Sequence, residues 1–282
     1  MTWTPKLVAL DVDGTIVNGA NELSDGVREA VVAIRDSGVE TVISTGRAIS
    51  GVMDTTGKLG FTEGLAVASN GAVVFQYLDD AAHPVEVIHS VTFDASAAVR
   101  RVLEQVPDAI VAVEQVGTGF RVNRPFPETE FAGQFVLDDV ESLIADPVTR
   151  VVIRSTDHTP AEFTAIVHDL GLEGTNYFIG YSAWLDLAPE GVSKASGLDV
   201  VCERLGIAPA DVLAVGDGNN DLEMLQWAGR GGAMGQSPDA LKNVADFVTG
   251  TVEDDGLATE LAKYLWSSRW CWFPRWTPEA ST

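Results

Sequence analysis

The chain has 282 residues, of which 46% are hydrophobic and 21% charged. This length suits about two domains, and the composition excludes wholesale disorder as well as collagen-like and solenoid architectures. The 18 Lys and Arg residues oppose 41 Asp and Glu residues, and the resulting net charge of −23 disfavours nucleic-acid binding. A small phosphate ester would also be repelled, unless a metal ion or local cations reverse the potential inside its site.

The two cysteines and the apolar runs bear on the cellular compartment. Cys202 and Cys271 lack metal-ligand spacing and are too few for a disulfide framework, which favours a reducing cytosol. The first apolar run, residues 7–10, is far shorter than a signal-peptide core. No stretch approaches the ~20 apolar residues of a membrane span. We therefore expect a cytoplasmic protein that is neither exported nor membrane-spanning.

The first third of the chain alternates short apolar runs with helical patterns. Ser24 can cap a helix whose apolar positions recur at helical spacing as far as Ile34, and Gly38 can end it. Buried strands are expected at residues 6–10, 41–43 and 65–68, each followed by a polar loop. This alternation predicts βαβ units around a parallel sheet, in which ligands gather beyond the carboxyl ends of the strands.

The pattern changes over about residues 83–186 and then returns. Within this stretch we expect strands at residues 85–90, 109–113 and 150–155 and helices at 95–106 and 160–170. Afterwards come a helix at 194–205, a strand at 212–215 and a helix at 222–228. We expect a doubly wound, parallel-sheet, Rossmann-like α/β core from residues 1–81 and 188–282, interrupted by an inserted α+β cap domain at 82–187.

Acidic residues follow two of the expected core strands. Asp11 and Asp13 end the first strand, at a spacing that can place a carboxylate and a neighbouring backbone carbonyl on one hard cation. Asp217 and Asp221 end another strand of the same sheet. Folding would bring these acids together, and the cluster would repel itself without a cation. The sequence therefore predicts a Mg²⁺ site.

Such a site suits phosphoryl transfer. A metal-held carboxylate can attack phosphorus while a second carboxylic acid protonates the leaving oxygen. Thr45 and Lys194 can supply donors to the phosphoryl group from two other loops, and Gly14, Gly46 and Gly218 allow tight turns near it. An isolated D-x-D-G is commonly only a turn, so the prediction depends on all these segments occurring together.

Four segments, in chain order, resemble the four motifs of the haloacid dehalogenase-like superfamily, and most closely those of its Cof-type phosphatase branch. They are DVDGT at 11–15, STGR at 44–47, GVSK at 191–194 and GDGNND at 216–221. SNGA at 69–72 resembles the motif that leads toward the cap of that branch. The resemblance covers about residues 5–264. Ala195, where the family often has Gly, and Gln236, where it often has Asn, leave the catalytic roles undisturbed.

The resemblance implies a role for each matching residue. Asp11 would be the nucleophile and Asp13 the general acid and then the base, while Thr45 and Lys194 would hold the phosphoryl oxygens. Mg²⁺ would be bound by the Asp11 carboxylate, the Asp13 backbone carbonyl and Asp217, with Asp221 and Asn220 supporting the metal waters or Lys194. The implied substrate-binding residues are Gly46, Arg47, Asn70, Gly71 and Asn220. Arg47 equally suits an ion pair with a surplus acid.

The implied activity is Mg²⁺-dependent hydrolysis of a small phosphorylated metabolite, a sugar phosphate or a phosphorylated cofactor, through an aspartyl-phosphate intermediate. A phosphomutase of the same chemistry and a catalytically idle regulatory module are the alternatives. In the insert, Glu114, Arg121, Asn123 and Arg124 suit contact with the leaving group, but a water-exposed strand face explains them equally well.

The C-terminal segment 266–282 differs from the rest of the chain. It holds Trp266, Trp270, Trp272 and Trp276, four of the seven tryptophans. Few basic residues offset the acidic body, so this composition favours packing on the core, or contact with a second copy or a partner, over membrane docking.

Overall fold

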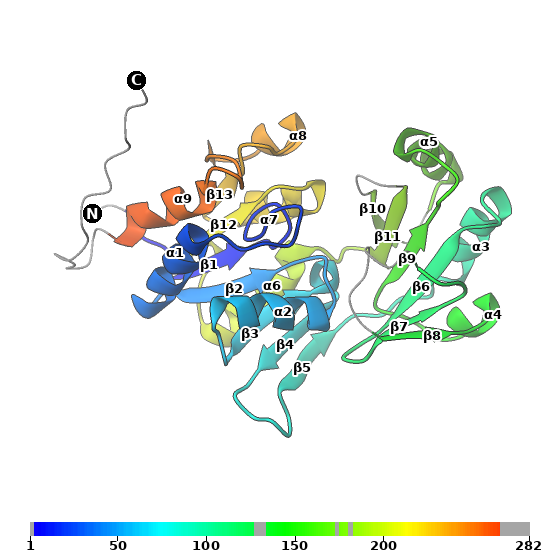
Figure 1. Cartoon of the computed structure of the whole chain (residues 1–282), viewed down its shortest axis with the longest axis horizontal. Coiled ribbons are helices and arrows are strands. Elements are labelled where there is room, and N and C mark those ends of the chain that lie inside the picture. Colours follow the sequence, from blue (N-terminus) through cyan, green and yellow to red (C-terminus); the bar gives the residue numbers. More distant parts are fainter. Residues whose placement is uncertain (1–2, 127–133, 173–174, 180–182, 266–282) are drawn as a thin grey trace.

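The computed structural model describes residues 3–126, 134–172, 175–179 and 183–265, and builds them around two β-sheets (Figure 1). The large sheet has the strand order β14-β13-β12-β1-β2-β3-β4-β5. Its strands are β1 (Leu7–Leu10), β2 (Glu40–Ser44), β3 (Gly64–Ala68), β4 (Val73–Tyr77), β5 (Val85–Ser90), β12 (Val212–Gly216), β13 (Arg230–Ala233) and β14 (Phe247–Val248).

The central strands of the large sheet are parallel and buried. Leu10 at the end of β1 pairs with Val215 of β12 on one side and with Ile43 of β2 on the other. The carboxyl ends of these three strands therefore lie level, and the loops that follow them meet at one edge. The expected strands and the doubly wound, Rossmann-like topology are confirmed, with β4 and β5 added as antiparallel strands at one side.

Helices cover both faces of the large sheet. The apolar side chains of α1 (Asp25–Asp36), α2 (Ile49–Leu59) and α9 (Gly256–Leu265) pack on one face. Those of α6 (Lys194–Leu205), α7 (Leu222–Trp227) and α8 (Asp239–Lys242) pack on the other. The Ser24 side chain accepts a hydrogen bond from the Val27 N–H, as expected of the cap of α1. Short 3₁₀ helices lie at Ser69–Gly71 (η1), Pro209–Asp211 (η2) and Asn219–Asp221 (η3).

The second sheet, in the order β10-β11-β9-β6-β7-β8, is formed within the expected insert. Its strands are β6 (Ile110–Gln115), β7 (Gly119–Val122), β8 (Gln134–Leu137), β9 (Val151–Arg154), β10 (Thr175–Ile179) and β11 (Trp184–Pro189). Helices α3 (Ser96–Gln105), α4 (Val140–Leu143) and α5 (Pro160–Leu170) cover one face. Alternate residues such as Ala112, Phe120 and Val152 form the other face, against which Ala48 of the first layer packs. This face looks onto the large sheet.

The two sheets divide the chain differently from the expected boundaries. We expected the insert to begin at residue 82, but β5 pairs with β4 in the large sheet. The chain first joins the second layer at Phe93, which bridges to Val148. At the other end, β11 extends to Pro189 rather than to residue 187. The boundary differs because β5 forms a hairpin with β4 and so belongs to the large sheet. The sequence of the loop between these two strands does not indicate to which sheet β5 belongs.

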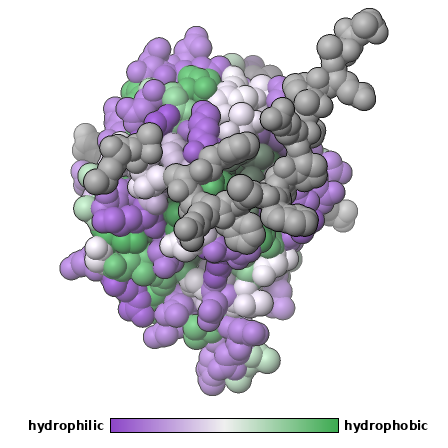
Figure 2. Space-filling model, turned by 90° about the vertical axis from the view of Figure 1, so that its left-hand side faces the viewer, coloured by the Kyte–Doolittle hydropathy of each residue, from purple (hydrophilic) through white to green (hydrophobic). Residues whose placement is uncertain are grey.

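The described helices are short. The longest, α1 and α6, have 12 residues, and no helix among the described residues is long and apolar enough to cross a bilayer. Figure 2 shows the end of the molecule that carries α9, where hydrophilic side chains are widespread and apolar ones gather in small groups. The Trp-rich segment 266–282, for which we expected packing or a subunit contact, lies outside the described residues.

Candidate active site

A cavity of about 800 Å³ lies at the carboxyl ends of the parallel strands, between the two layers. The large sheet and its loops contribute most of the sequence-predicted residues to its wall. The insert contributes three side chains, so residues of both layers line the cavity, which stays partly open to solvent. The residues that line it include, from the large sheet and its loops, Asp11, Asp13, Thr45, Gly46, Arg47, Asp217 and Asn220, and, from the insert, Phe120, Arg150 and Trp184.

Lys194 and two carboxylates form the buried centre of the site. The Nζ atom of Lys194, at the start of α6, donates to Asp11 Oδ1 and to Asp221 Oδ1, both at 2.6 Å. The side chains of Lys194 and Asp221 are fully buried. Burial disfavours the charged ammonium, but the two carboxylates outweigh this effect and raise the pKa of Lys194. Lys194 is therefore a fixed cation behind the nucleophile candidate Asp11.

The remaining charge at this centre is negative. Carboxylate oxygens of Asp11, Asp217 and Asp221 lie within 4.8 Å of one another. Burial and repulsion by Asp221 raise the pKa of Asp11 well above its usual range, despite Lys194. The same two causes raise the pKa of Asp217 to about 6. One lysine does not balance three carboxylates, and their oxygens are the ligands that hard divalent cations prefer. The donor set fits a divalent metal ion.

The loop after β12 holds Asp221 and Asp217 in place. Asp221 Oδ2 accepts the backbone N–H groups of Asp217 at 3.0 Å and Gly218 at 2.9 Å. Asp221 thereby fixes both the loop and Lys194, while it stays within reach of an ion. Gly14 packs so closely on Asp217 that a Cβ atom would lie 2.1 Å from its Oδ2. Gln236, in the loop after β13, donates to the Gly14 carbonyl at 2.5 Å and so connects this loop to the loop after β1.

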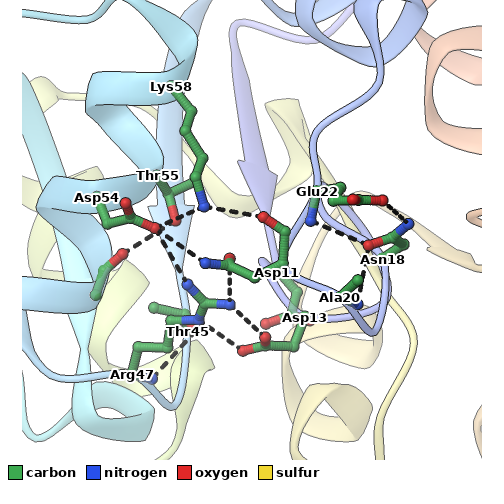
Figure 3. A network of polar contacts seen from close by, with 12 residues as sticks. Asp11, Asp13, Asn18, Ala20, Glu22, Thr45, Arg47, Asp54, Thr55 and Lys58 are labelled. Atoms are coloured by element: carbon green, nitrogen blue, oxygen red, sulfur yellow. Dashed lines mark hydrogen bonds and ion pairs between the residues drawn. The ribbon is translucent and has the colours of Figure 1, made fainter. Parts of the chain in front are cut away.

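Asp13 faces the cavity and is paired with Arg47. The Nε and Nη2 atoms of Arg47 donate to the two carboxylate oxygens of Asp13 at 2.9 and 2.5 Å. In Figure 3 the guanidinium group lies between Asp13 and Asp54. Its Nη2 atom also donates to Asn21 Oδ1 at 3.0 Å. The Asp13 side chain remains 64% exposed. Arg47 thus forms the ion pair that the sequence offered as one alternative, and it also lines the cavity.

The loops after β2 and β3 lie beside these acids. Thr45 is buried, and its hydroxyl accepts the Arg47 N–H at 3.2 Å. The Asn70 side chain accepts a hydrogen bond from Asn220 at 3.0 Å and packs on Gly46. Gly71 has a φ of +101°, and a Cβ atom there would lie 1.9 Å from the Ser193 carbonyl. The close approach of Gly71 lets the chain before Lys194 lie against this loop.

Two buried carboxylates of the insert contact the loop after β3: Glu114, for which the sequence offered leaving-group contact as one alternative, and Asp186, which sequence reasoning missed. The Ser69 hydroxyl donates to Glu114 Oε2 at 2.6 Å, and the Asn70 amide donates to Asp186 at 3.3 Å. Arg150 donates to both oxygens of Asp186. The signal in the sequence was a charged residue within an apolar strand, as with Glu114 in β6. Other polar residues of the insert bond within it: Arg121 with Asp138, Asn123 with the backbone of Ala109 and Val111, and Arg124 with Asp108.

Comparisons with known proteins identify the family of this chain. The family model described as haloacid dehalogenase-like hydrolase matches residues 8–261. The chain belongs to this family. It is 28% identical over 277 residues to the 5-amino-6-(5-phospho-D-ribitylamino)uracil phosphatase YitU of Bacillus subtilis (strain 168), covering 94% of this chain and 99% of the relative. It is also 26% identical to the phosphoglycolate phosphatase of Methanoculleus marisnigri, covering 92% and 96% of the two chains.

Solved structures give the same fold. The phosphatase BT1666 of Bacteroides thetaiotaomicron, from the haloalkanoate enzyme superfamily, superposes with a TM-score of 0.73 at 30% identity, over 93% of this chain and 95% of that one. A haloacid dehalogenase-like hydrolase from B. subtilis superposes with a TM-score of 0.76 at 23% identity, over 91% and 99%. The doubly wound core with an inserted cap domain is therefore the fold of this family, as expected from the motifs.

Proposed function

We propose that this hydrolase cleaves the phosphate ester of a small phosphorylated metabolite in a Mg²⁺-dependent reaction that passes through an aspartyl-phosphate on Asp11. Membership of the haloacid dehalogenase-like hydrolases, with phosphatases among the relatives, makes the chain a phosphoric monoester hydrolase. The observation that carries the rest is the convergence of Asp11, Asp217, Asp221 and Lys194. Asp11 and Asp217 line the same cavity as Asp13, and Lys194 and Asp221 are buried behind them.

In the first step an oxygen of Asp11 attacks phosphorus and the bond from phosphorus to the ester oxygen breaks. The ester oxygen takes a proton from the carboxylic acid of Asp13, so that an alcohol leaves rather than an alkoxide. Asp13 suits this role because it borders the cavity and is exposed, whereas Asp11 is buried against Lys194. Arg47 donates to both oxygens of the Asp13 carboxylate, so one of these two hydrogen bonds has to open when Asp13 carries the proton, while the other can keep the carboxyl group in place.

In the second step Asp13, now a carboxylate, removes a proton from water, and the resulting hydroxide attacks phosphorus. The bond from phosphorus to the Asp11 oxygen breaks, which restores Asp11 and releases orthophosphate. Lys194 and Thr45 hold phosphoryl oxygens during both steps. Mg²⁺, for which Asp11, the Asp13 carbonyl and Asp217 are the proposed ligands, would supply charge neutralisation for the phosphoryl group when bound.

The test is release of inorganic phosphate from an aryl phosphate, with Mg²⁺ and with EDTA, by the parent and by Asp11→Asn. We expect the parent to turn over only with Mg²⁺ and Asp11→Asn to lose at least ~10³-fold in kcat. Asp25→Asn, the same change at an exposed acid of α1, is the matched control and keeps the parent rate. Equal rates in all samples would contradict the proposal and favour an idle regulatory module.

The substrate class is tested with a panel of sugar phosphates and phosphorylated cofactors, ranked by kcat/KM. Release of stoichiometric orthophosphate supports a phosphatase. Conversion of one sugar phosphate into its isomer without that release would instead identify a phosphomutase. We place the enzyme in the cytoplasm, because two cysteines without ligand spacing suit a reducing compartment.

A further inference from the structure

Aromatic side chains of the insert form a connected cluster, which we call the aromatic platform: Phe120, Phe126, Phe135 and Trp184. The Phe126 ring stands at 72° to the Trp184 ring, with centroids 5.8 Å apart. Phe135 lies 6.3 Å from Phe120 and 6.5 Å from Phe126 and is nearly parallel to Phe126. Aromatic rings attract one another at these distances. The rings therefore hold one another in fixed orientations.

The platform belongs to the face of the second sheet that looks onto the catalytic core. Phe120 and Phe126 are buried in the apolar cluster on this face, whereas α3, α4 and α5 cover the opposite face. Trp184 and Ala48 pack on the same cluster. Ala48 directly follows Arg47, which pairs with Asp13. The platform therefore begins beside the residues that would bind and cleave the phosphate ester.

Trp184 is the platform residue that best presents a ring to a ligand. Both Trp184 and Phe120 line the cavity that contains Asp11 and Asp13. Phe120 is only 1% exposed, whereas Trp184 is half-buried. Phe126 supports the Trp184 ring edge to face. Trp184 thus lies at the cavity wall with a fixed orientation, which reduces the entropy lost when a ligand stacks on it.

The cavity is larger than the phosphoryl group requires. Its volume of about 800 Å³ lies in the range of sites that enclose whole cofactor-sized molecules. Its wall also includes polar side chains, among them Asn18, Asn21 and Ser50. The site thus offers charge for a phosphate, hydrogen-bonding groups for hydroxyls, and an aromatic surface.

We propose that the aromatic platform binds the planar ring of a phosphate ester in which a flexible hydroxylated chain joins the ring to the phosphate, with Trp184 as the stacking residue. The inference rests on the proposed phosphatase function and narrows its substrates to ring-bearing esters. Stacking favours such an ester over the same chain without a ring, because every planar ring offers a face to Trp184.

The test compares flavin mononucleotide, a tricyclic ring on a ribityl phosphate, with ribose 5-phosphate. We expect the parent to prefer the flavin ester in kcat/KM. Trp184→Leu should lower the ratio of the two kcat/KM values about ten-fold, mainly through the KM for the flavin ester. Trp184→Phe, which keeps a ring, should retain most of the ratio. Trp227→Leu, the same change at a tryptophan that donates to Asp199 on α6, is the control and should leave the ratio unchanged.

The outcomes separate this inference from the proposed function. A parent without preference for the flavin ester, or a ratio that Trp184→Leu leaves within about two-fold, overturns the inference. Failure to release phosphate from any ester overturns the proposed function. In that case the binding of flavin mononucleotide tests the platform directly, because stacking on tryptophan quenches flavin fluorescence. With Mg²⁺ present, and with Asp11→Asn in both proteins to prevent turnover, the protein with Trp184 should quench bound flavin mononucleotide, and the protein that also carries Trp184→Leu should need to be about ten-fold more concentrated. Equal quenching by both proteins overturns the inference.

Discussion

Replacing Lys194 by methionine isolates the electrostatic role of a buried ammonium group. Lys194 lies 2.6 Å from oxygens of Asp11 and Asp221, whose side chains are 5% and 0% exposed. Methionine keeps an unbranched side chain but removes the charge, so these carboxylates lose a close counter-ion. Removal of one partner from a buried ion pair costs about 3–5 kcal/mol, because the remaining charge is uncompensated. We expect Lys194→Met to lower the free energy of unfolding by that amount.

The assay is urea denaturation in EDTA near neutral pH, followed by circular dichroism. EDTA is essential, since a bound cation would compensate the buried carboxylates that have lost Lys194 and would mask the loss of stability. Lys6→Met is the matched control, because Lys6 also pairs with an acid at 2.7 Å, Asp211, but its side chain is 66% exposed. An exposed pair contributes about 0–1 kcal/mol, so the same substitution there should change little.

A second variant tests the cause of the loss. Adding Asp221→Asn to Lys194→Met removes one of the uncompensated carboxylates, so the double variant should be more stable than Lys194→Met alone. The reasoning is refuted if Lys194→Met costs no more than Lys6→Met. It is also refuted if the added Asp221→Asn destabilises the protein further, because the loss would then come from packing rather than from charge.

Three further predictions concern the surroundings of the same site. Gly71→Ala should cost about 1–3 kcal/mol in urea denaturation, because φ is +101° and the Cβ atom would meet the Ser193 carbonyl; the unstrained Gly57→Ala should cost nothing comparable. Mg²⁺ affinity, measured by calorimetry, should weaken as pH falls through about 6, because protonated Asp217 cannot bind the ion; an unchanged affinity at pH 5 would contradict this. Burial raises the pKa of Glu114 in the folded protein. The protonated carboxyl group therefore contributes stability at low pH, and this contribution is lost as the pH rises from the pKa of the unfolded state to that of the folded state. The stability of Glu114→Gln relative to the parent should accordingly increase from pH 4 to pH 8.

Local patterns in the sequence were sufficient to predict the centre of the site. Asp11 and Asp217 follow apolar runs that are too short and too continuous to be amphipathic helices, so both runs read as buried parallel strands. Parallel neighbours end at the same edge, which brings the two acids together without further information. The pairing of Leu10 with Val215 is the physical basis of that success.

Contacts between distant segments were beyond such patterns. The sequence analysis placed the residues of β5 in the insert, and only the pairing of β5 with β4 shows that they belong to the large sheet. Likewise, the charge of Glu114 and Asp186 within apolar strands signals a buried partner but does not name it. Their partners are Ser69 and Asn70, in a loop of the other layer. Burial of a carboxylate depends on that long-range packing.

The same loop makes the position of the cap relevant to the chemistry. Asn70 donates to Asp186 of β11 and accepts a hydrogen bond from Asn220, in the loop that also carries Asp217 and Asp221. Asp186 is held in turn by Arg150, which lines the cavity. One amide thus bonds both to the sheet that carries the aromatic platform and to the loop that carries the acids. Movement of the second sheet relative to the first would break the hydrogen bond from Asn70 to Asp186, and Asn70 also bonds to Asn220, so we expect the placement of the cap to affect the loop that carries Asp217 and Asp221.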